Sequence, residues 1–97
     1  MMSFILVSFP LLAGAQGRVT VTGSVKDAGD LPVVAATVFE QGTTNGTSTD
    51  AKGGFSLTLT KGSTLVVSCI GYETKEVKIT DGKTHYDLVI KEDALSL

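Results

Sequence analysis

The fold of this chain is decided by residues 42–76, which read GTTNGTSTDAKGGFSLTLTKGSTLVVSCIGYETKE. Short runs rich in Thr, Val, Leu and Phe alternate there with glycine-containing turns at nearly regular spacing. Alternating polarity favours half-buried strands, and glycine in the intervening turns favours tight reversals of the chain. This pattern predicts an all-β fold, a small antiparallel β-sandwich.

The same periodicity extends to both sides of this stretch. It predicts seven strands, at residues 18–26, 35–41, 47–50, 55–60, 64–70, 73–80 and 84–91, and no segment of the folded domain indicates a helix. Residues 64–70 are apolar on both faces, so we expect them to form the most central strand. Asp81 and Gly82 predict a hairpin turn before the last strand. In the second strand, Ala36, Val38 and Glu40 share one face, opposite Thr37 and Phe39.

The first residues have the form of an export signal. Residues 4–12 are an apolar run that is too short to span a bilayer, and small residues follow at 13–15. We therefore expect a signal peptide over residues 1–15, cleaved between Ala15 and Gln16, and an exported, periplasmic product. The expected domain covers residues 16–94, and residues 95–97 read as the start of a truncated linker.

The charge and hydropathy of the remaining chain narrow its partners. The formal net charge is −2 and no basic stripe is present, which gives no electrostatic footprint for nucleic acid. No second apolar segment is long enough to cross a bilayer, so we expect no direct membrane insertion of the mature domain.

The sequence offers little for catalysis. Cys69 is the single cysteine, so no internal disulfide is possible, and its apolar surroundings predict a buried, unreactive thiol. Cys69 also lies far from the expected cleavage site. We therefore expect no lipoprotein anchor, because such an anchor requires a cysteine at the cleavage site. His85 is the single histidine and alternates with the inward set of its strand, so we expect it to face solvent. We predict no enzyme, no catalytic residue and no cofactor.

Several short motifs have a structural explanation that we prefer to a binding one. Asp50 opens a loop in which Lys52 occupies the place of a second calcium-binding carboxylate, so we predict no metal site. The run 82–84 lacks the upstream glycine and the helix of a phosphate-binding loop. Asn45 and Gly46 read as a turn. Phe39, Tyr72 and Tyr86 lie on different strands, so core and rim packing is a better account than a sugar-stacking platform.

The order of strands and turns resembles the carboxypeptidase-regulatory-like domain at the amino terminus of SusC/RagA-type TonB-dependent outer-membrane transporters of Bacteroidota. The matching pieces are residues 21–27, 31–38, 42–47, 49–50 with 54–57, and 65–72, followed by 91–94. The residues of these motifs to which we give structural roles are Gly23, Asp50, Gly54, Phe55, Gly71 and Tyr72. Backbone geometry, rather than the approach of a ligand, is the expected reason for the glycines, to which we add Gly53.

The resemblance implies a transthyretin-like sandwich in the periplasm, ahead of a plug and a barrel that import glycan fragments or peptides. Neither plug, barrel nor TonB-contact segment lies in these 97 residues. We therefore predict a non-enzymatic accessory domain that contacts protein partners on the periplasmic side of such a transporter. Two alternatives stay open: a free-standing secreted module that binds glycan or peptide, and a non-functional truncated reading frame.

Overall fold

The computed structural model describes residues 17–80 and 82–93. The expected signal peptide, its cleavage between Ala15 and Gln16, and the linker at residues 95–97 lie outside this part of the chain. The seven strands of the described residues are β1 (Arg18–Lys26), β2 (Thr37–Glu40), β3 (Gly46–Ser48), β4 (Gly54–Thr60), β5 (Thr64–Ser68), β6 (Lys75–Lys78) and β7 (His85–Val89). The prediction of seven strands and an all-β fold is confirmed.

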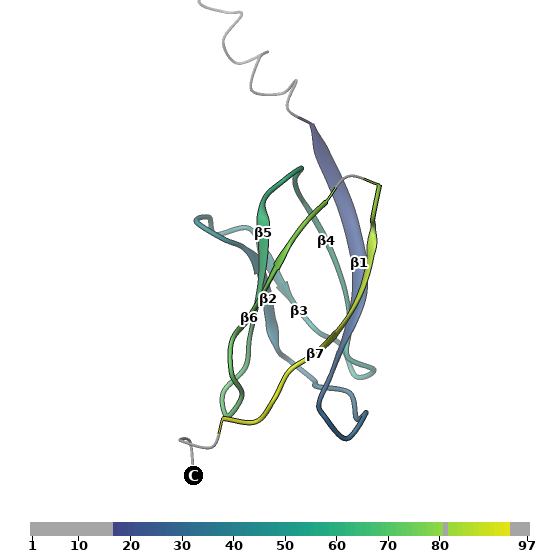
Figure 1. The fold of residues 1–97 in the computed structure, drawn as a ribbon, viewed down its shortest axis with the longest axis vertical. Helices are drawn as coiled ribbons and strands as arrows, with labels where there is room; N and C mark the ends of the chain where they lie inside the picture. Colours follow the sequence, from purple (N-terminus) through teal and green to yellow (C-terminus); the bar gives the residue numbers. More distant parts are fainter. Residues whose placement is uncertain (1–16, 81, 94–97) are drawn as a thin grey trace, which may run out of the picture.

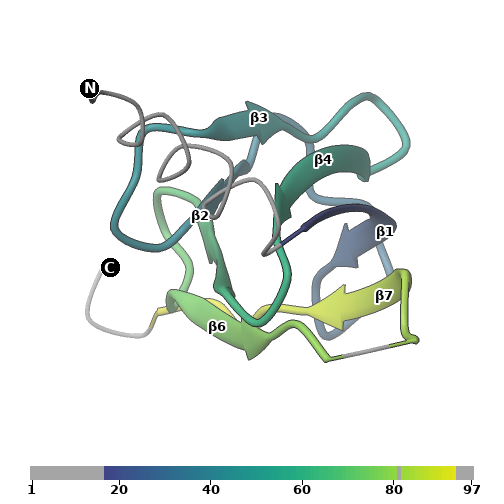
Figure 2. The ribbon, with the colours of Figure 1, turned by 90° about the horizontal axis from the view of Figure 1, so that it is seen from above.

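The strands form two sheets that face each other (Figures 1 and 2). One sheet has the order β4-β1-β7 and the other the order β3-β2-β5-β6. Every second residue along a strand points into the space between the sheets, as the sequence predicts. The fully enclosed side chains include Val21 and Val25 of β1, Val38 of β2, Leu59 of β4, Leu65 and Val67 of β5, and Ile90 after β7.

One pairing differs from the antiparallel expectation. β1 and β7 run parallel, with Thr22 opposite His85 and Lys26 opposite Val89, whereas the other four strand pairs are antiparallel. β6 and β7 follow each other in the chain but belong to different sheets. They therefore do not pair with each other, so the hairpin predicted at Asp81 and Gly82 is wrong.

The second strand starts two residues later than predicted. Ala35 has a φ of 62°, in the left-handed region that extended strands do not use. A buried threonine, Thr49, holds this bend: its hydroxyl donates to Val33 O at 2.6 Å and accepts from Ala36 N at 2.9 Å. The prediction that the strand begins at Ala35 was wrong because tertiary hydrogen bonds fix the bend.

The central strand ends earlier than its apolar sequence suggests. β5 does lie inside its sheet, and its three middle residues are buried on both faces, as predicted. However, Tyr72 N donates to Cys69 O at 3.0 Å and Gly71 has a φ of 91°, so the chain turns after Ser68. Ile70 is consequently 99% exposed, which corrects its assignment to the strand. Cys69 is half-buried against the core rather than fully enclosed.

Candidate interaction surface

One side of the sandwich is closed by a buried carboxylate. Glu40 of β2 is only 6% exposed, and its Oε1 accepts a hydrogen bond from Asn45 Nδ2 at 3.1 Å. Its Oε2 accepts from Thr60 N at 3.4 Å, and Asn45 Nδ2 also donates to Thr58 O at 2.7 Å. Thr60 N and Thr58 O both point away from β1. The side chains of Glu40 and Asn45 therefore provide hydrogen-bond partners for the outer edge of β4 and join the two sheets.

The bond from Asn45 is the main reason that the pKa of Glu40 lies below its ordinary value. Sequence reasoning placed Glu40 on the same face of its strand as Ala36 and Val38 but drew nothing from it. An ionisable residue that shares a strand face with two apolar residues was the available signal. It also assigned Asn45 to an Asn-Gly turn, whereas Gly46 begins β3, and Asn45 forms part of the closure.

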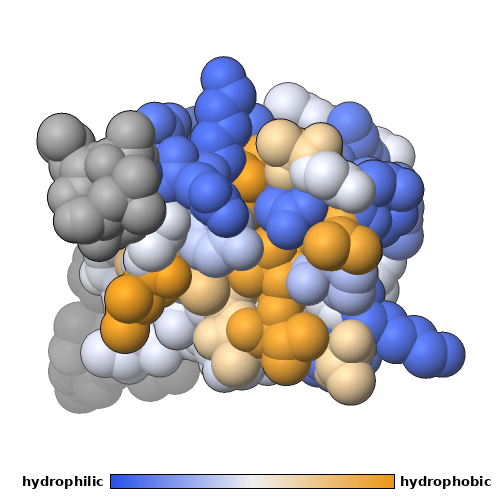
Figure 3. Space-filling view, turned by 90° about the horizontal axis from the view of Figure 1, so that it is seen from below, coloured by the Kyte–Doolittle hydropathy of each residue, from blue (hydrophilic) through white to orange (hydrophobic). Residues whose placement is uncertain are grey.

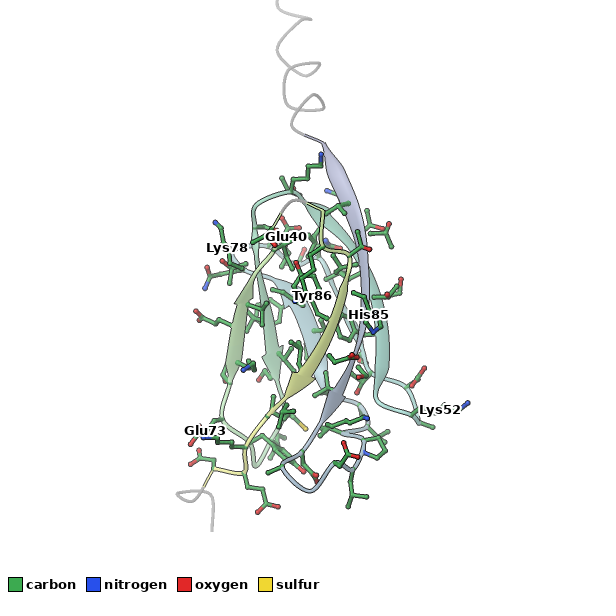
Figure 4. The ribbon with its side chains drawn as sticks, turned by 45° about the vertical axis from the view of Figure 1, so that its right-hand side comes forward. Glu40, Lys52, Glu73, Lys78, His85 and Tyr86 are labelled. Carbon is green, nitrogen blue, oxygen red and sulfur yellow. The ribbon has the colours of Figure 1, made fainter. Side chains whose placement is uncertain are left out.

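The opposite side of the sandwich has no such closure. β6 and β7 form its two edges, and they diverge, whereas β3 and β4 lie close together (Figure 2). A groove of about 290 Å³ runs between them, lined by residues 73–76 and 89–91. At its lower end the sheets meet again, because Glu73 N donates to Lys91 O at 2.8 Å and Tyr72 pairs with Glu92 (Figure 4 shows Glu73).

The outer face of β1 and β7 carries a polar cluster. Thr22 Oγ1 lies 3.1 Å from His85 Nδ1, His85 Nε2 lies 3.0 Å from Asp87 Oδ1, and Ser24 Oγ donates to the same Asp87 oxygen at 2.9 Å. The hydrogen bond from Ser24, followed by the one from His85, holds the pKa of Asp87 below its ordinary value. Sequence reasoning missed Ser24 and Asp87, since their contact depends on the parallel pairing of β1 with β7.

This cluster is a poor setting for nucleophilic catalysis. The side chains of His85 and Asp87 are 62% and 72% exposed, so water competes for every one of their hydrogen bonds. His85 faces outward, as predicted, whereas Tyr86 points into the sandwich (Figure 4). Cys69 lies on the β5–β6 connection and packs against the core, and no described contact joins it to His85.

Asp50 organises the turn between β3 and β4. Its Oδ1 accepts from Lys52 N at 2.9 Å and from Gly54 N at 2.8 Å, and these bonds lower the pKa of the carboxyl. The carboxylate is therefore occupied by the backbone of its own loop, and Lys52 extends into solvent (Figure 4). Within residues 17–80 and 82–93, no group of three or more His, Cys, Asp or Glu side chains is placed to hold a metal ion.

The three aromatic residues considered for sugar stacking do not form one platform. Tyr86 is buried, and its hydroxyl accepts from Thr80 N at 3.2 Å. Tyr72 packs against the core at the lower end of the molecule. Phe39 alone lines an open concavity of about 460 Å³, together with threonine and serine side chains of β2, β3 and their connection.

The glycines of the motifs act in two different ways. Gly53 and Gly71 have positive φ values of 78° and 91°, as the backbone argument expects. Gly23 does not: a Cβ there would lie 1.9 Å from Tyr86 O and 2.8 Å from Phe55 Cζ. Its role is to let β7 and Phe55 approach β1. Gly54 is likewise outside the positive-φ set and lies against the Asp50 carboxylate.

The lower end of the molecule exposes separate apolar side chains. Leu31 and Val34 lie in the β1–β2 connection, and Ile70 lies in the β5–β6 turn. Figure 3 shows this end, where hydrophobic areas are interrupted by hydrophilic ones. Single apolar residues of this kind are normal at protein surfaces and do not by themselves mark a site.

Comparison with known proteins identifies the family to which this sandwich belongs. The sequence profile of the CarboxypepD_reg-like domain matches residues 21–97. The chain belongs to the CarboxypepD_reg-like domain family. The immunoglobulin- and transthyretin-like sandwich described above is the fold of this family, so the resemblance noted in the sequence is confirmed.

Two curated relatives of this CarboxypepD_reg-like domain are TonB-dependent receptors. It is 40% identical over 76 residues to the TonB-dependent receptor SusC of Bacteroides thetaiotaomicron, covering 78% of this chain and 7% of the receptor. It is 44% identical over 78 residues to the TonB-dependent receptor P39 of Formosa agariphila, covering 79% of this chain and 7% of that receptor. The chain thus spans about 7% of the length of these relatives.

A solved structure supports the fold. In a type II cohesin–X-dockerin complex from Acetivibrio cellulolyticus, one chain superposes with a TM-score of 0.56 at 22% identity, covering 74% of this chain and 56% of the other. At that identity the likeness concerns the fold alone. In the described part of the CarboxypepD_reg-like domain, no helix has the length and apolar character needed to span a membrane.

Proposed function

We propose that this chain is a non-enzymatic accessory domain of a SusC-like TonB-dependent importer of glycans or peptides, and that it contacts protein partners on the periplasmic side of the outer membrane. The observation that carries the proposal is the identity of 40% and 44% to two TonB-dependent receptors over nearly four-fifths of the chain. The surface agrees with this role, because it offers strand edges and a groove for protein contact, and the residues that the structure describes form no enclosed catalytic cluster.

Export belongs to the same proposal. A signal peptide over residues 1–15 delivers the domain to the periplasm, with cleavage between Ala15 and Gln16. Mass spectrometry of the amino terminus of the protein isolated from native cells tests this step directly. The expected result is a chain that starts at Gln16, and an intact Met1 in the cytosolic fraction contradicts it.

The decisive experiment is an immunoblot of fractionated native cells with an antibody raised against the domain. We expect a band much heavier than 10.1 kDa in the outer-membrane fraction, because the domain then forms part of a receptor chain. A band at the size of this chain in the soluble periplasm contradicts the proposal. A band in the cytosol contradicts export as well.

The free-standing module is the second candidate, and the concavity at Phe39 favours it. An aromatic ring beside several hydroxyl groups is a common arrangement for contact with a sugar, although this concavity is wide open. Isothermal titration of the full chain with the glycans that the native cells import distinguishes the two functions. Binding that Phe39→Ala abolishes, from a protein found alone in the periplasm, would support the module.

A further inference from the structure

Along one side of β7, the main-chain groups have no hydrogen-bond partner among the described residues. Thr22 N donates to Thr84 O and Ile90 N donates to Lys26 O, so the even-numbered positions around β7 pair with β1. The N–H and C=O groups of His85, Asp87 and Val89 therefore point to the open side of the sheet. No described residue hydrogen bonds to these groups.

The other edges of the two sheets are protected. β4 is covered by the side chains of Asn45 and Glu40, and β3 is only three residues long and lies beside β4. The free edge of β6 carries exposed charges at Lys75, Glu76 and Lys78, which oppose the addition of a strand (Figure 4 shows Lys78).

β7 lacks these protective features. It contains no proline, lysine or bulge, and its only acidic side chain is turned back over β1 by the hydrogen bond from Ser24 to Asp87. Val89 is 52% exposed at the mouth of the groove between β6 and β7. An edge of this kind is a template for pairing with another extended chain.

We propose that β7 is a strand-addition site, at which an extended segment of a partner protein joins the β4-β1-β7 sheet as its fourth strand. The inference deepens the proposed function and rests on it for the identity of the partner. Residues of the segment that face inward lie beside the inward set of β7 and require apolar side chains. On the outer face, a basic side chain fits beside Asp87 and a β-branched one, such as that of threonine, beside Val89.

A second copy of this chain is a poorer occupant than a different segment. Antiparallel pairing of two β7 strands over their whole length places Asp87 directly opposite Asp87 of the other copy. Like charges at directly opposed positions destabilise a strand pair. Self-association through β7 is therefore an outcome that the experiment must detect, and it contradicts the proposal.

The test uses the full chain and the synthetic peptide acetyl-Val-Thr-Val-Lys-Val-Thr-Val-amide, followed by amide hydrogen exchange. Without peptide, the amides of His85, Asp87 and Val89 exchange rapidly. At a peptide concentration about ten times the dissociation constant, we expect their exchange to slow about tenfold. The same peptide with glutamate in place of its lysine binds more weakly, and a version methylated on alternate main-chain nitrogens does not bind.

Two variants locate the site. Val89→Pro removes an edge N–H without removing a hydrogen bond to β1, so the fold persists and peptide binding is lost, whereas Val89→Thr retains binding. Asp87→Lys reverses the preference, so that the glutamate peptide binds better than the lysine peptide. This second variant keeps the test decisive if Val89→Pro fails to fold.

Several results overturn the proposal. The proposal fails if the peptide protects β6 rather than β7, or if binding is unchanged in both variants. It also fails if the amides of β7 gain no protection up to the solubility limit of the peptide. Protection that appears without peptide and rises with protein concentration contradicts it too, because it indicates self-association. Any of these leaves the fractionation experiment untouched, since that experiment measures where the domain resides. Conversely, if the peptide binds at β7 while the immunoblot finds the protein outside the outer-membrane fraction, that result contradicts the proposed function but not the strand-addition site.

Discussion

At the scale of single residues, Glu40 shows how a charge inside a small sandwich is accommodated. Its two oxygens accept hydrogen bonds from Asn45 and from the backbone of Thr60, so the ionised form is favoured despite burial. A neutral amide does not fit the same partners, because one of its two positions is a donor that meets another donor.

We predict that Glu40→Gln lowers the free energy of unfolding by about 1–3 kcal/mol, the cost of leaving a buried donor unsatisfied. The direction of the pH dependence follows from the lowered pKa in the folded state. The stabilisation by Glu40 is present above the unfolded-state pKa and is lost as the pH falls through the lower folded-state value.

Urea denaturation between neutral pH and about pH 3 measures both effects. The wild type should lose stability below about pH 4.5, and the variant should lose less of it. Glu76→Gln, on the exposed edge of β6, is the matched control and should leave the profile nearly unchanged. Equal pH profiles for wild type and Glu40→Gln would refute the role given to Glu40.

At the scale of elements, the contact between β1 and its two neighbours depends on a missing side chain. Gly23 lies between Phe55 of β4 and the carbonyl of Tyr86 in β7, with no room for a Cβ. Sequence reasoning attributed Gly23 to backbone geometry, whereas the structure shows a close approach between strands. The close approach arises from strands that are far apart in the chain, whereas positive φ at a turn is a local property.

We predict that Gly23→Ala destabilises the domain by about 3 kcal/mol or more, because the atom that the new methyl meets is a backbone oxygen in the sheet. Gly42→Ala is the comparison, since Gly42 has a φ of 82° and open space around it. Its cost should be only about 1–2 kcal/mol, from left-handed backbone strain. Denaturation midpoints of the two variants provide the measurement, and equal losses would contradict the steric role given to Gly23.

At the scale of the whole molecule, the apolar residues of one short run have opposite environments. Leu65 and Val67 are fully enclosed, whereas Ile70, three residues after Val67, is almost fully exposed. The hydrophobicity of these side chains does not distinguish the buried ones from the exposed one. The turn at Gly71 separates them, because it ends β5 and carries the chain out of the core before β6 begins.

We predict that Leu59→Ala, in the centre of the core, lowers the free energy of unfolding by about 2–5 kcal/mol. Ile70→Ala should change it by less than about 0.5 kcal/mol, because no buried contact is lost. Thermal and urea unfolding of the two variants provide the measurement. A large loss for Ile70→Ala would mean that this side chain is buried in solution.

The sequence by itself determined the number of strands, the inward set of most of them and the family, because alternation along a strand directly reports which face is buried. It also placed His85 outward and Tyr86 inward. Only the tertiary structure decided that β7 lies parallel to β1, that Glu40 and Asn45 close one side, and that Ser24 meets Asp87. These features join residues distant in the chain. Every residue except proline offers the same main-chain donor and acceptor. The amino-acid sequence of a strand therefore does not reveal which neighbour it pairs with or which edge stays free.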